Sequence, residues 1–289
     1  MFYLIYDVSK LITYLKIMSC GVVRTYHKQD CDWNCNCNYY EGTVLKKEYF
    51  HNNGIKEGIY KIFWYNGLLK EEVNYINNKK EGIYKSYYEK GQTYEEVNYI
   101  DDKKEGIYKS YHNNGLLQEE VNYINNKKEG EYKKYYENGL LHEEVNYIDN
   151  KKEGEYKKYY KNRQLYINCY YFKDRKEKVY TEYNDNGSLL KEYIFVNGTL
   201  REKYEYKNGL KNGVYESYYE NRQIYIKTTY IDNKLNGIYK KYHNNGQIFI
   251  ECNYVDDKLT GIYKEYKMTH KFNGTPTIEI NYINDKKID

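Results

Sequence analysis

The chain has 289 residues, of which 44 are tyrosine and only one is proline. Its 46 lysines and arginines nearly balance 42 aspartates and glutamates, which leaves a net charge of +4 at pH 7. A nucleic-acid-binding protein would carry clustered basic charge, whereas lysine and glutamate alternate here, so we expect no nucleic-acid partner. The sequence also lacks the run of about 20 apolar residues that a transmembrane helix requires.

Residues 1–41 differ from the rest of the chain and contain the pattern of one amphipathic helix. Apolar residues recur there at spacings of four and three, at Leu4, Val8, Leu11, Leu15 and Met18. Such a stripe predicts a helix of about four turns. Two roles stay open for it, a cap on the structure that follows or an anchor to a membrane surface or a partner. Charged residues interrupt the apolar run, which disfavours a cleaved signal peptide.

The cysteines carry two different patterns. Cys31, Cys35 and Cys37 are spaced C-x3-C-x-C, without the C-x2-C knuckle and distant second pair of a typical zinc site, so ordinary thiols are favoured over metal or a disulfide. Cys169 and Cys252 each take a position that valine holds in other copies of a repeat, and we expect small core residues there. Free thiols favour a reducing compartment, which predicts a cytoplasmic protein, with a membrane-peripheral location as the alternative.

Residues 42–289 are built from a repeating segment. The sequence from Gly82 to Tyr99 returns with few changes from Gly106, 24 residues later, and again from Gly130 and Gly154. About ten copies fit into this part of the chain, and a fixed period of this length indicates an array of repeats. We therefore expect two parts, an N-terminal segment over 1–41 and a repeat array over 42–289.

Within one copy the residue pattern has a period of two, which predicts strands. Asn138-Gly139 is a strong signal for a two-residue hairpin turn. Pairing outward from this turn sets apolar residues opposite apolar ones and charges opposite their counter-charges. The predicted pairs are Tyr136–Leu141, Tyr135–His142, Lys134–Glu143, Lys133–Glu144, Tyr132–Val145 and Gly130–Tyr147. The connection 148–153 would then return the chain and set Tyr147 opposite Gly154 and Glu143 opposite Lys158.

The predicted fold is all-β: an elongated single-layer antiparallel meander of about ten β-hairpin repeats, with a short N-terminal helix. Two copies depart from the pattern, because Asn162-Arg163 and Asn221-Arg222 replace Asn-Gly. A positive φ angle costs arginine more than glycine. We therefore expect looser or differently turned hairpins at these two places.

The recurring elements resemble the MORN repeat, in particular the variant found in bacterial proteins of the YwqK antitoxin type. One copy shows all of them, as Gly106-Ile-Tyr108, Asn114-Gly115-Leu116-Leu117, Val121-Asn122-Tyr123 and Asn126-Lys127-Lys128-Glu129-Gly130. The resemblance implies an elongated sheet of hairpins that associates with proteins or membranes and has no catalytic residues of its own.

Histidines and carboxylates do not predict an enzyme. His51, His112 and His243 all precede Asn-Asn-Gly, so they are interpreted as copies of one turn-entry position, which tyrosine fills in other repeats. Adjacent carboxylates such as Glu119-Glu120 point to opposite faces of a strand and are expected to pair with lysines rather than to act as an acid and a base. No nucleophile, zinc or nucleotide-binding motif is present, and we expect no catalytic residues and no cofactor.

The sequence thus favours a non-catalytic scaffold that binds another protein. Two alternatives stay open, a platform on an anionic membrane surface that uses the lysine pairs at 79–80, 103–104, 127–128 and 151–152, and an antitoxin-like or adaptor protein. The candidate interaction surface is a row of rings 24 residues apart on the face with fewer aliphatic partners: Tyr87, Tyr111, Tyr135 and Tyr159. Tyrosine is enriched at interfaces. The competing interpretation is that these rings only shield the backbone of a one-layer sheet.

Overall fold

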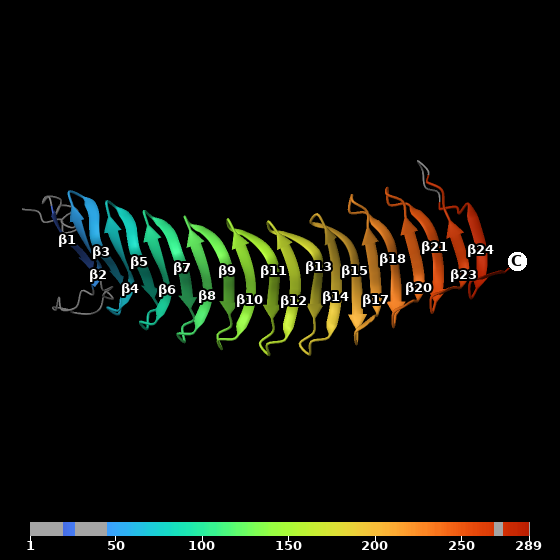
Figure 1. The fold of residues 1–289 in the computed structure, drawn as a ribbon, viewed down its shortest axis with the longest axis horizontal. Coiled ribbons are helices and arrows are strands. Elements are labelled where there is room, and N and C mark those ends of the chain that lie inside the picture. The colour runs from blue at the N-terminus through green and yellow to red at the C-terminus, as the bar shows by residue number, and fades with distance from the viewer. Residues whose placement is uncertain (1–19, 27–44, 269–273, 289) are drawn as a thin grey trace, which may run out of the picture. The chain divides into compact units, whose positions relative to one another are not determined.

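The computed structural model describes residues 20–26, 45–268 and 274–288 of the chain, and all regular structure in these residues is β-strand. The predicted helix and the cluster Cys31, Cys35 and Cys37 lie outside the described residues. The chain divides into two compact units, unit 1 over Met1–Lys127 and unit 2 over Lys128–Asp289. In each unit, successive long strands lie side by side and antiparallel (Figure 1).

Unit 1 contains eight described strands. They are β1 (Cys20–Tyr26), β2 (Leu45–Asn52), β3 (Ile55–Phe63), β4 (Leu69–Ile76), β5 (Lys79–Tyr87), β6 (Thr93–Ile100), β7 (Lys103–Tyr111) and β8 (Leu117–Ile124). Each strand from β2 to β7 pairs with the strand before it and the strand after it.

Unit 2 begins with the same pattern and then becomes less regular. Its first strands are β9 (Lys127–Tyr135), β10 (Leu141–Ile148), β11 (Lys151–Tyr159), β12 (Leu165–Phe172), β13 (Arg175–Tyr183), β14 (Leu189–Val196) and β15 (Thr199–Lys207). Further strands are β16 (Leu210–Lys211), β17 (Gly213–Tyr218), β18 (Ile224–Ile231), β19 (Lys234–Leu235), β20 (Gly237–Tyr242) and β21 (Ile248–Val255). The unit ends with β22 (Lys258–Leu259), β23 (Gly261–Glu265), β24 (Ile278–Ile283) and β25 (Lys286–Ile288).

Two kinds of turn alternate along the chain. Asp101 and Asp102 have φ angles of 54° and 65°, so this two-residue turn has the twist that suits a hairpin, and Ile100 pairs directly with Lys103. The turn after β5 is wider: Tyr88 N donates to Gln92 O at 2.8 Å, and only a glycine, Gly91, has a positive φ angle. Most of the tight turns are therefore Asn/Asp pairs; the others are Asn53-Gly54, Lys173-Asp174, Asn197-Gly198 and Asn208-Gly209.

This arrangement corrects the predicted hairpin at Asn138-Gly139. The tight turn lies at Asp149-Asn150, inside the segment that was predicted to be a longer connection. At the Asn-Gly site, Asn138 Oδ1 accepts a hydrogen bond from Leu140 N at 3.1 Å, which stabilises the wider turn. The prediction was wrong because both turns contain residues that tolerate a positive φ angle.

Most of the predicted strand pairs are present, and the errors lie beside the turns and at the bulge. The pairs Gly130–Tyr147, Tyr132–Val145, Lys133–Glu144 and Lys134–Glu143 are confirmed, and Glu143 also pairs with Lys158 as expected. Leu141, however, pairs with Tyr135, and Tyr147 pairs with Lys152 instead of Gly154. The register shifts because Gly154, with a φ angle of 89°, begins a bulge that adds residues to β11.

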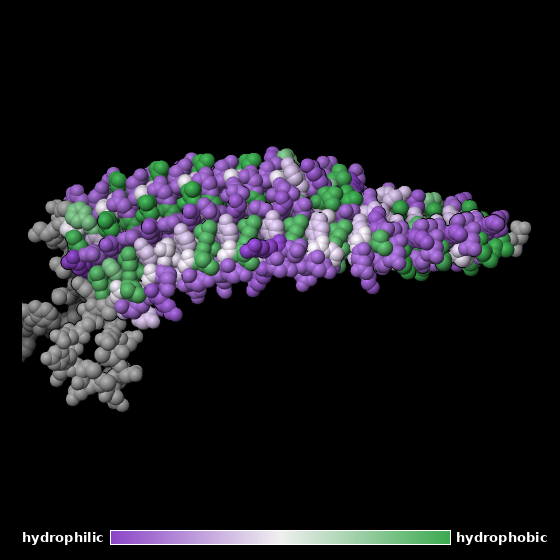
Figure 2. Space-filling model, turned by 60° about the horizontal axis from the view of Figure 1, so that its bottom comes forward, coloured by the Kyte–Doolittle hydropathy of each residue, from purple (hydrophilic) through white to green (hydrophobic). Residues whose placement is uncertain are grey.

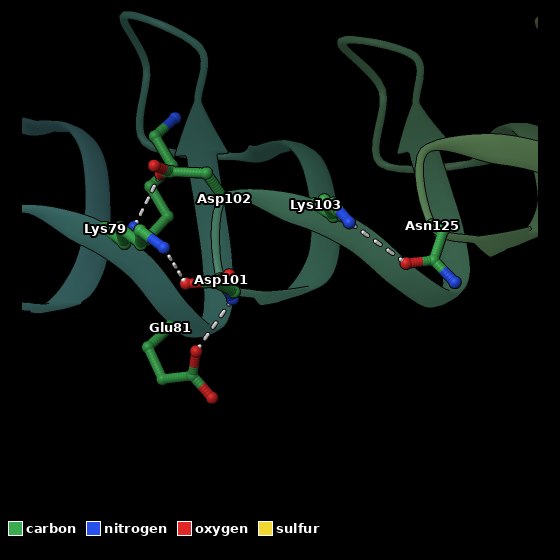
Figure 3. Close-up of polar contacts among 7 residues, drawn as sticks. Lys79, Glu81, Asp101, Asp102, Lys103 and Asn125 are labelled. Atoms are coloured by element: carbon green, nitrogen blue, oxygen red, sulfur yellow. Dashed lines mark hydrogen bonds and ion pairs between the residues drawn. The ribbon is translucent and has the colours of Figure 1, made fainter.

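Hydrogen bonds from each turn fasten it to the hairpin before it (Figure 3). Lys80 N donates to Asp102 Oδ1 at 2.7 Å, and Asp102 N donates back to Lys80 O at 3.1 Å. Asp101 N donates to Glu81 Oε2 at 2.9 Å. The same three bonds recur in both units, for example at Lys56 with Asn78 and at Lys128 with Asn150. The Glu-Gly and Asn/Asp elements of the repeat therefore join neighbouring hairpins.

A line of small side chains covered by tyrosine rings forms the core of the sheet. In unit 1, Val73, Val97 and Val121 are 3%, 1% and 1% exposed. The rings of Tyr84 and Tyr99 form one cluster with Val73 and Val97, and the two rings meet edge to face with their centroids 5.9 Å apart. In unit 2, Cys169 and Cys252 take the valine position and are buried free thiols, as predicted. Burial raises the pKa of each thiol to about 11.

The two arginine turns keep the geometry of the glycine turns, so the predicted loosening is wrong. Arg163 and Arg222 have φ angles of 70° and 68° and donate their backbone N–H to the residue three positions earlier, as Gly91 does. Asn162 and Asn221 hold these turns through bonds to the next turn, at 2.7 and 2.9 Å. The hydrogen bonds around the turn outweigh the conformational preference of arginine.

Candidate interaction surface

The sheet of unit 1 has two different faces, because successive side chains of a strand point to opposite sides. We call one the tyrosine-valine face, which includes Tyr84 and Val97. We call the other the isoleucine face, which includes Ile83, Lys85 and Tyr87 on β5. Figure 2 shows hydrophobic residues in rows that are separated by rows of hydrophilic residues.

The predicted tyrosine row lies on the isoleucine face of unit 1, at Tyr87 and Tyr111. Both rings are half-buried. The Tyr87 hydroxyl donates to Glu72 Oε1 at 2.9 Å, and the Tyr111 hydroxyl donates to Glu96 Oε1 at 2.7 Å. Each carboxylate lies on the strand that pairs with the tyrosine's strand across a tight turn, so the bond fixes the ring against the neighbouring strand.

Tyr135 and Tyr159 occupy the same position in unit 2. Both are half-buried, and the Tyr159 hydroxyl donates to Glu144 Oε1 at 2.6 Å. Tyr135 pairs with Leu141 through its backbone. All four rings are thus half-buried at the same position of the repeat.

Burial and the glutamate contacts suppress ionisation of these rings. Burial, then the hydrogen bond to Glu72, raises the pKa of Tyr87 to about 12. Burial and the bond to Glu96 likewise raise the pKa of Tyr111 to about 12. The neutral ring, with its hydroxyl as a donor, is therefore the form present near neutral pH.

The charges beside the row are balanced in pairs. Lys85 Nζ lies 3.6 Å from Glu96, and Lys109 Nζ lies 3.8 Å from Glu120. The adjacent carboxylates of each repeat face opposite ways, as predicted: Glu96 accepts from Tyr111, while Glu95 accepts the Tyr108 hydroxyl at 2.9 Å on the tyrosine-valine face. The prediction named lysine partners only, and the tyrosine hydroxyls are additional donors.

The two lysines of each pair proposed for membrane contact lie in different surroundings. Lys79 Nζ lies 2.5 Å from Asp101 at the turn (Figure 3), whereas Lys80 Nζ lies 4.6 and 5.0 Å from the ring centroids of Tyr84 and Tyr99. The same cation–π arrangement recurs at Lys104. The two ammonium groups of a pair therefore do not present one combined positive patch.

The histidines take two positions instead of one. His243 Nε2 lies 3.4 Å from Tyr266 O, as the Tyr88 hydroxyl reaches Tyr111 O at 2.7 Å, so His243 fills the turn-entry position as predicted. His51 does not, because it lies within β2 and pairs with Lys56, at the position that Tyr75 holds one repeat later. In the described residues, no three His, Cys, Asp or Glu side chains converge as a metal site would require. No helix there is long and apolar enough to cross a membrane.

One feature of this surface was not recognised in the sequence. Ile59, Ile83 and Ile107, which follow the repeat glycine, are 60%, 63% and 57% exposed. The period of two places them opposite to the buried tyrosine, and that alternation could have identified them as surface residues.

Comparison with solved structures gives only distant similarity. The crystal structure titled TcdB2-TccC3-TEV matches 82% of this chain with 10% identity and a TM-score of 0.20. The crystal structure titled TcdB2-TccC3 also matches 82%, with 11% identity and a TM-score of 0.17. This chain covers only 14% of either matched chain.

No curated protein matches the sequence. A family model described as the MORN repeat variant matches five segments, which are residues 56–77, 80–101, 104–125, 128–149 and 235–256. Each matched segment spans two paired strands with the wider turn between them and ends at the first residue of a tight turn. The chain is therefore a MORN-repeat protein.

Proposed function

We propose that this protein is a non-catalytic scaffold that binds a partner protein through the tyrosine row. MORN repeats are generally associated with protein or membrane interactions. The observation that carries the proposal is the fixed, half-buried state of Tyr87 and Tyr111 on the isoleucine face. Buried free thiols at Cys169 and Cys252 support a reducing, cytoplasmic location as part of the same proposal.

A fixed ring is well suited to binding. A ring whose hydroxyl is already bonded to glutamate loses little conformational freedom when a partner covers it. Tyrosine also supplies apolar area and a polar tip together, which explains its enrichment in interfaces. The row therefore offers the same contact again at each repeat.

The charges favour a protein partner over an anionic membrane. Lys85 and Lys109 beside the row are paired with glutamates, so the surface carries both signs of charge. A lipid surface would be attracted to unpaired basic charge, and its binding would weaken with salt. We therefore expect vesicles of anionic lipid to bind poorly even at low salt, as a co-sedimentation measurement would show.

Replacing two rings tests the proposal. Tyr111→Ser with Tyr135→Ser removes the rings, while the matched variant Tyr111→Phe with Tyr135→Phe keeps them and removes only the hydroxyls. Affinity purification with quantitative mass spectrometry should find partners that the serine variant loses and the phenylalanine variant retains. A serine variant that melts earlier but binds the same partners per folded molecule would instead show that the row only shields the backbone.

A further inference from the structure

Most repeats place one of their own lysines over a pair of aromatic rings. Lys80 Nζ lies 4.6 and 5.0 Å from the ring centroids of Tyr84 and Tyr99. The negative face of an aromatic ring attracts an ammonium group placed over it. Lysines take this position in six successive repeats, at Lys56, Lys80, Lys104, Lys128, Lys152 and Lys176.

Two later repeats in unit 2 have leucine at the lysine position. The position is identified by a backbone bond to the next tight turn, which Lys80 N makes at 2.7 Å. Leu235 N donates to Asp257 Oδ1 at 2.6 Å in the same way. Leu259 N donates to Asp285 Oδ1 at 2.7 Å. The exchange of lysine for leucine therefore leaves the backbone of the repeat unchanged.

The ring pairs of these two repeats are intact. The ring centroids of Tyr239 and Tyr254 lie 5.8 Å apart, and those of Tyr263 and Tyr282 lie 6.3 Å apart. Each pair meets edge to face, as in the repeats that carry a lysine. All four rings are half-buried, and in the described part of unit 2 no lysine or arginine lies over any of them. We call these the two open ring pairs.

Carboxylates remain beside the open ring pairs although the cation is missing. Asp257 and Asp285 hold the turns of these repeats, and among the described residues neither lies within ion-pair distance of a lysine or arginine. Burial raises the pKa of Tyr254, and Cys252 and Asp285 raise it further. Leucine is shorter than lysine and carries no charge, so it cannot supply the cation. The two repeats thus keep the aromatic and negative groups of a cation site.

We propose that the two open ring pairs bind lysine or arginine side chains of a partner protein. Each incoming cation takes the place over the rings that Lys80 takes in its own repeat, and Asp257 and Asp285 complement its charge. The pairs hold equivalent positions of neighbouring hairpins, two strand spacings or about 9.6 Å apart. The partner therefore presents two basic side chains at about this distance.

The open ring pairs and the tyrosine row lie on opposite faces. Tyr239 pairs with the buried Cys252 as Tyr84 pairs with Val97, so it belongs to the face of unit 2 that corresponds to the tyrosine-valine face. The tyrosine row lies on the other face. The inference is therefore independent of the proposed function.

Lysines placed in the chain itself test the inference, because they compete for the rings. The double variant Leu235→Lys with Leu259→Lys restores the residue that six other repeats carry, so it should fold. Its own ammonium groups should weaken binding of a fluorescein-labelled hexalysine peptide about tenfold. Fluorescence anisotropy on the full chain measures this at an ionic strength of about 0.15 M, where charges more than about 8 Å apart are largely screened.

A matched control separates binding to the rings from net charge. Ile238→Lys with Ile262→Lys adds the same two charges to the same repeats on the opposite face, where the isoleucines are 58% and 49% exposed. This control should weaken peptide binding by less than about twofold, because the added charges are screened. Equal weakening by the two lysine variants would overturn the inference, since only net charge would then matter.

Unit 1 supplies the reciprocal experiment. Lys80→Leu with Lys104→Leu opens two of its ring pairs and should add a second binding site for the peptide. Lys79→Leu with Lys103→Leu removes two lysines at the turns instead, and should add none. These variants decide the question if Leu235→Lys with Leu259→Lys loses its strand signal in circular dichroism.

Two further outcomes would overturn the inference. One is that the unchanged chain shows no saturable binding of the hexalysine peptide. The other is that Lys80→Leu with Lys104→Leu adds no more binding than Lys79→Leu with Lys103→Leu.

Discussion

The hairpins of unit 1 and those of unit 2 are joined by the same hydrogen bonds, but the strands of unit 1 are more regular. From β3 to β8 each odd-numbered strand is continuous through a bulge at a glycine, such as Gly82. From residue 210 onward in unit 2 the corresponding strand divides, as β16 and β17 do around Asn212, which donates its backbone N–H to Glu205 O at 2.9 Å. Lys178 even takes the glycine position with a φ angle of 60°.

The difference shows which features of the repeat are essential. The bonds between hairpins persist in both units, as at Lys80 with Asp102 and at Lys211 with Asn233, both 2.7 Å. Glycine at the bulge and at the wider turn is favourable but replaceable, because neighbouring hydrogen bonds hold the backbone. In a linear array, each hairpin depends chiefly on the hairpins beside it.

The largest effect is expected from changing the number of strands. Deleting residues 82–105 removes one whole repeat and joins Glu81 to Gly106, so the Glu-Gly junction and the strand direction are retained and unit 1 should fold. Deleting residues 82–93 removes half a repeat, which should reverse the direction of the following strands and unfold unit 1. Circular dichroism melts of both variants measure this. Equal damage from both deletions would show that the hairpins are packed as one globular core.

Alkaline pH should unfold both units over one range. Burial is the main cause that raises the pKa of Tyr111 in unit 1, and of Tyr171 and Tyr239 in unit 2, to about 12. Tyrosine in an unfolded chain titrates near 10. The neutral rings therefore stabilise the fold below about pH 10, and this stabilisation is lost as the pH rises toward about 12.

Tyrosinate absorbance followed together with the strand signal in circular dichroism measures this range. The two signals should change together above pH 10. Full ionisation of the tyrosines with an intact strand signal would contradict the proposed shielding of the rings. Unfolding of only one unit would show that the aromatic core matters more in that unit.

Removing one hydrogen bond at a tight turn should lower the stability of the protein moderately. Asp102→Ala removes the acceptor of the Lys80 N–H and places alanine at a φ angle of 65°, which should destabilise by about 1–2 kcal/mol. Asp102→Asn is the matched control, because Asn78 and Asn126 hold this position in neighbouring repeats. Urea unfolding measures both. If Asp102→Asn lost as much stability as Asp102→Ala, the negative charge rather than the hydrogen bond would be required.

The smallest effect is expected where unit 2 departs from the glycine pattern. Arg163→Gly should stabilise the protein by about 0.5–1 kcal/mol, because glycine adopts a φ angle of 70° without strain. The reciprocal change in unit 1, Gly91→Ala, should destabilise the protein by a similar amount, because alanine would have to adopt the φ angle of 88°. No clash adds to this cost, because the added Cβ would meet only Leu68 Cδ1 at an ordinary 3.8 Å. Thermal melts compare the two. Destabilisation by Arg163→Gly would indicate that the arginine side chain contributes more than its backbone conformation costs.

The centre of each repeat could be predicted from the sequence because its pairs are local and chemically complementary. Val145 opposite Tyr132, and Lys133 opposite Glu144, follow from alternation within one hairpin. The assignment of Cys169 and Cys252 to the core follows from their phase in the repeat. The contact of Tyr87 with Glu72 joins β5 to β4 across the tight turn, and alternation within one strand does not show it.

The sequence by itself determined the repeat, the all-β fold and the residues that share a face, since these depend on the period of 24 and the period of two. Only the tertiary structure decided which turn is tight, where the bulge shifts the register and which carboxylate each tyrosine contacts. These features depend on hydrogen bonds such as those of Asp101 and Asp102 with Glu81 and Lys80. The partners lie about 20 residues apart and meet only when neighbouring hairpins pack together, so local propensity does not specify them.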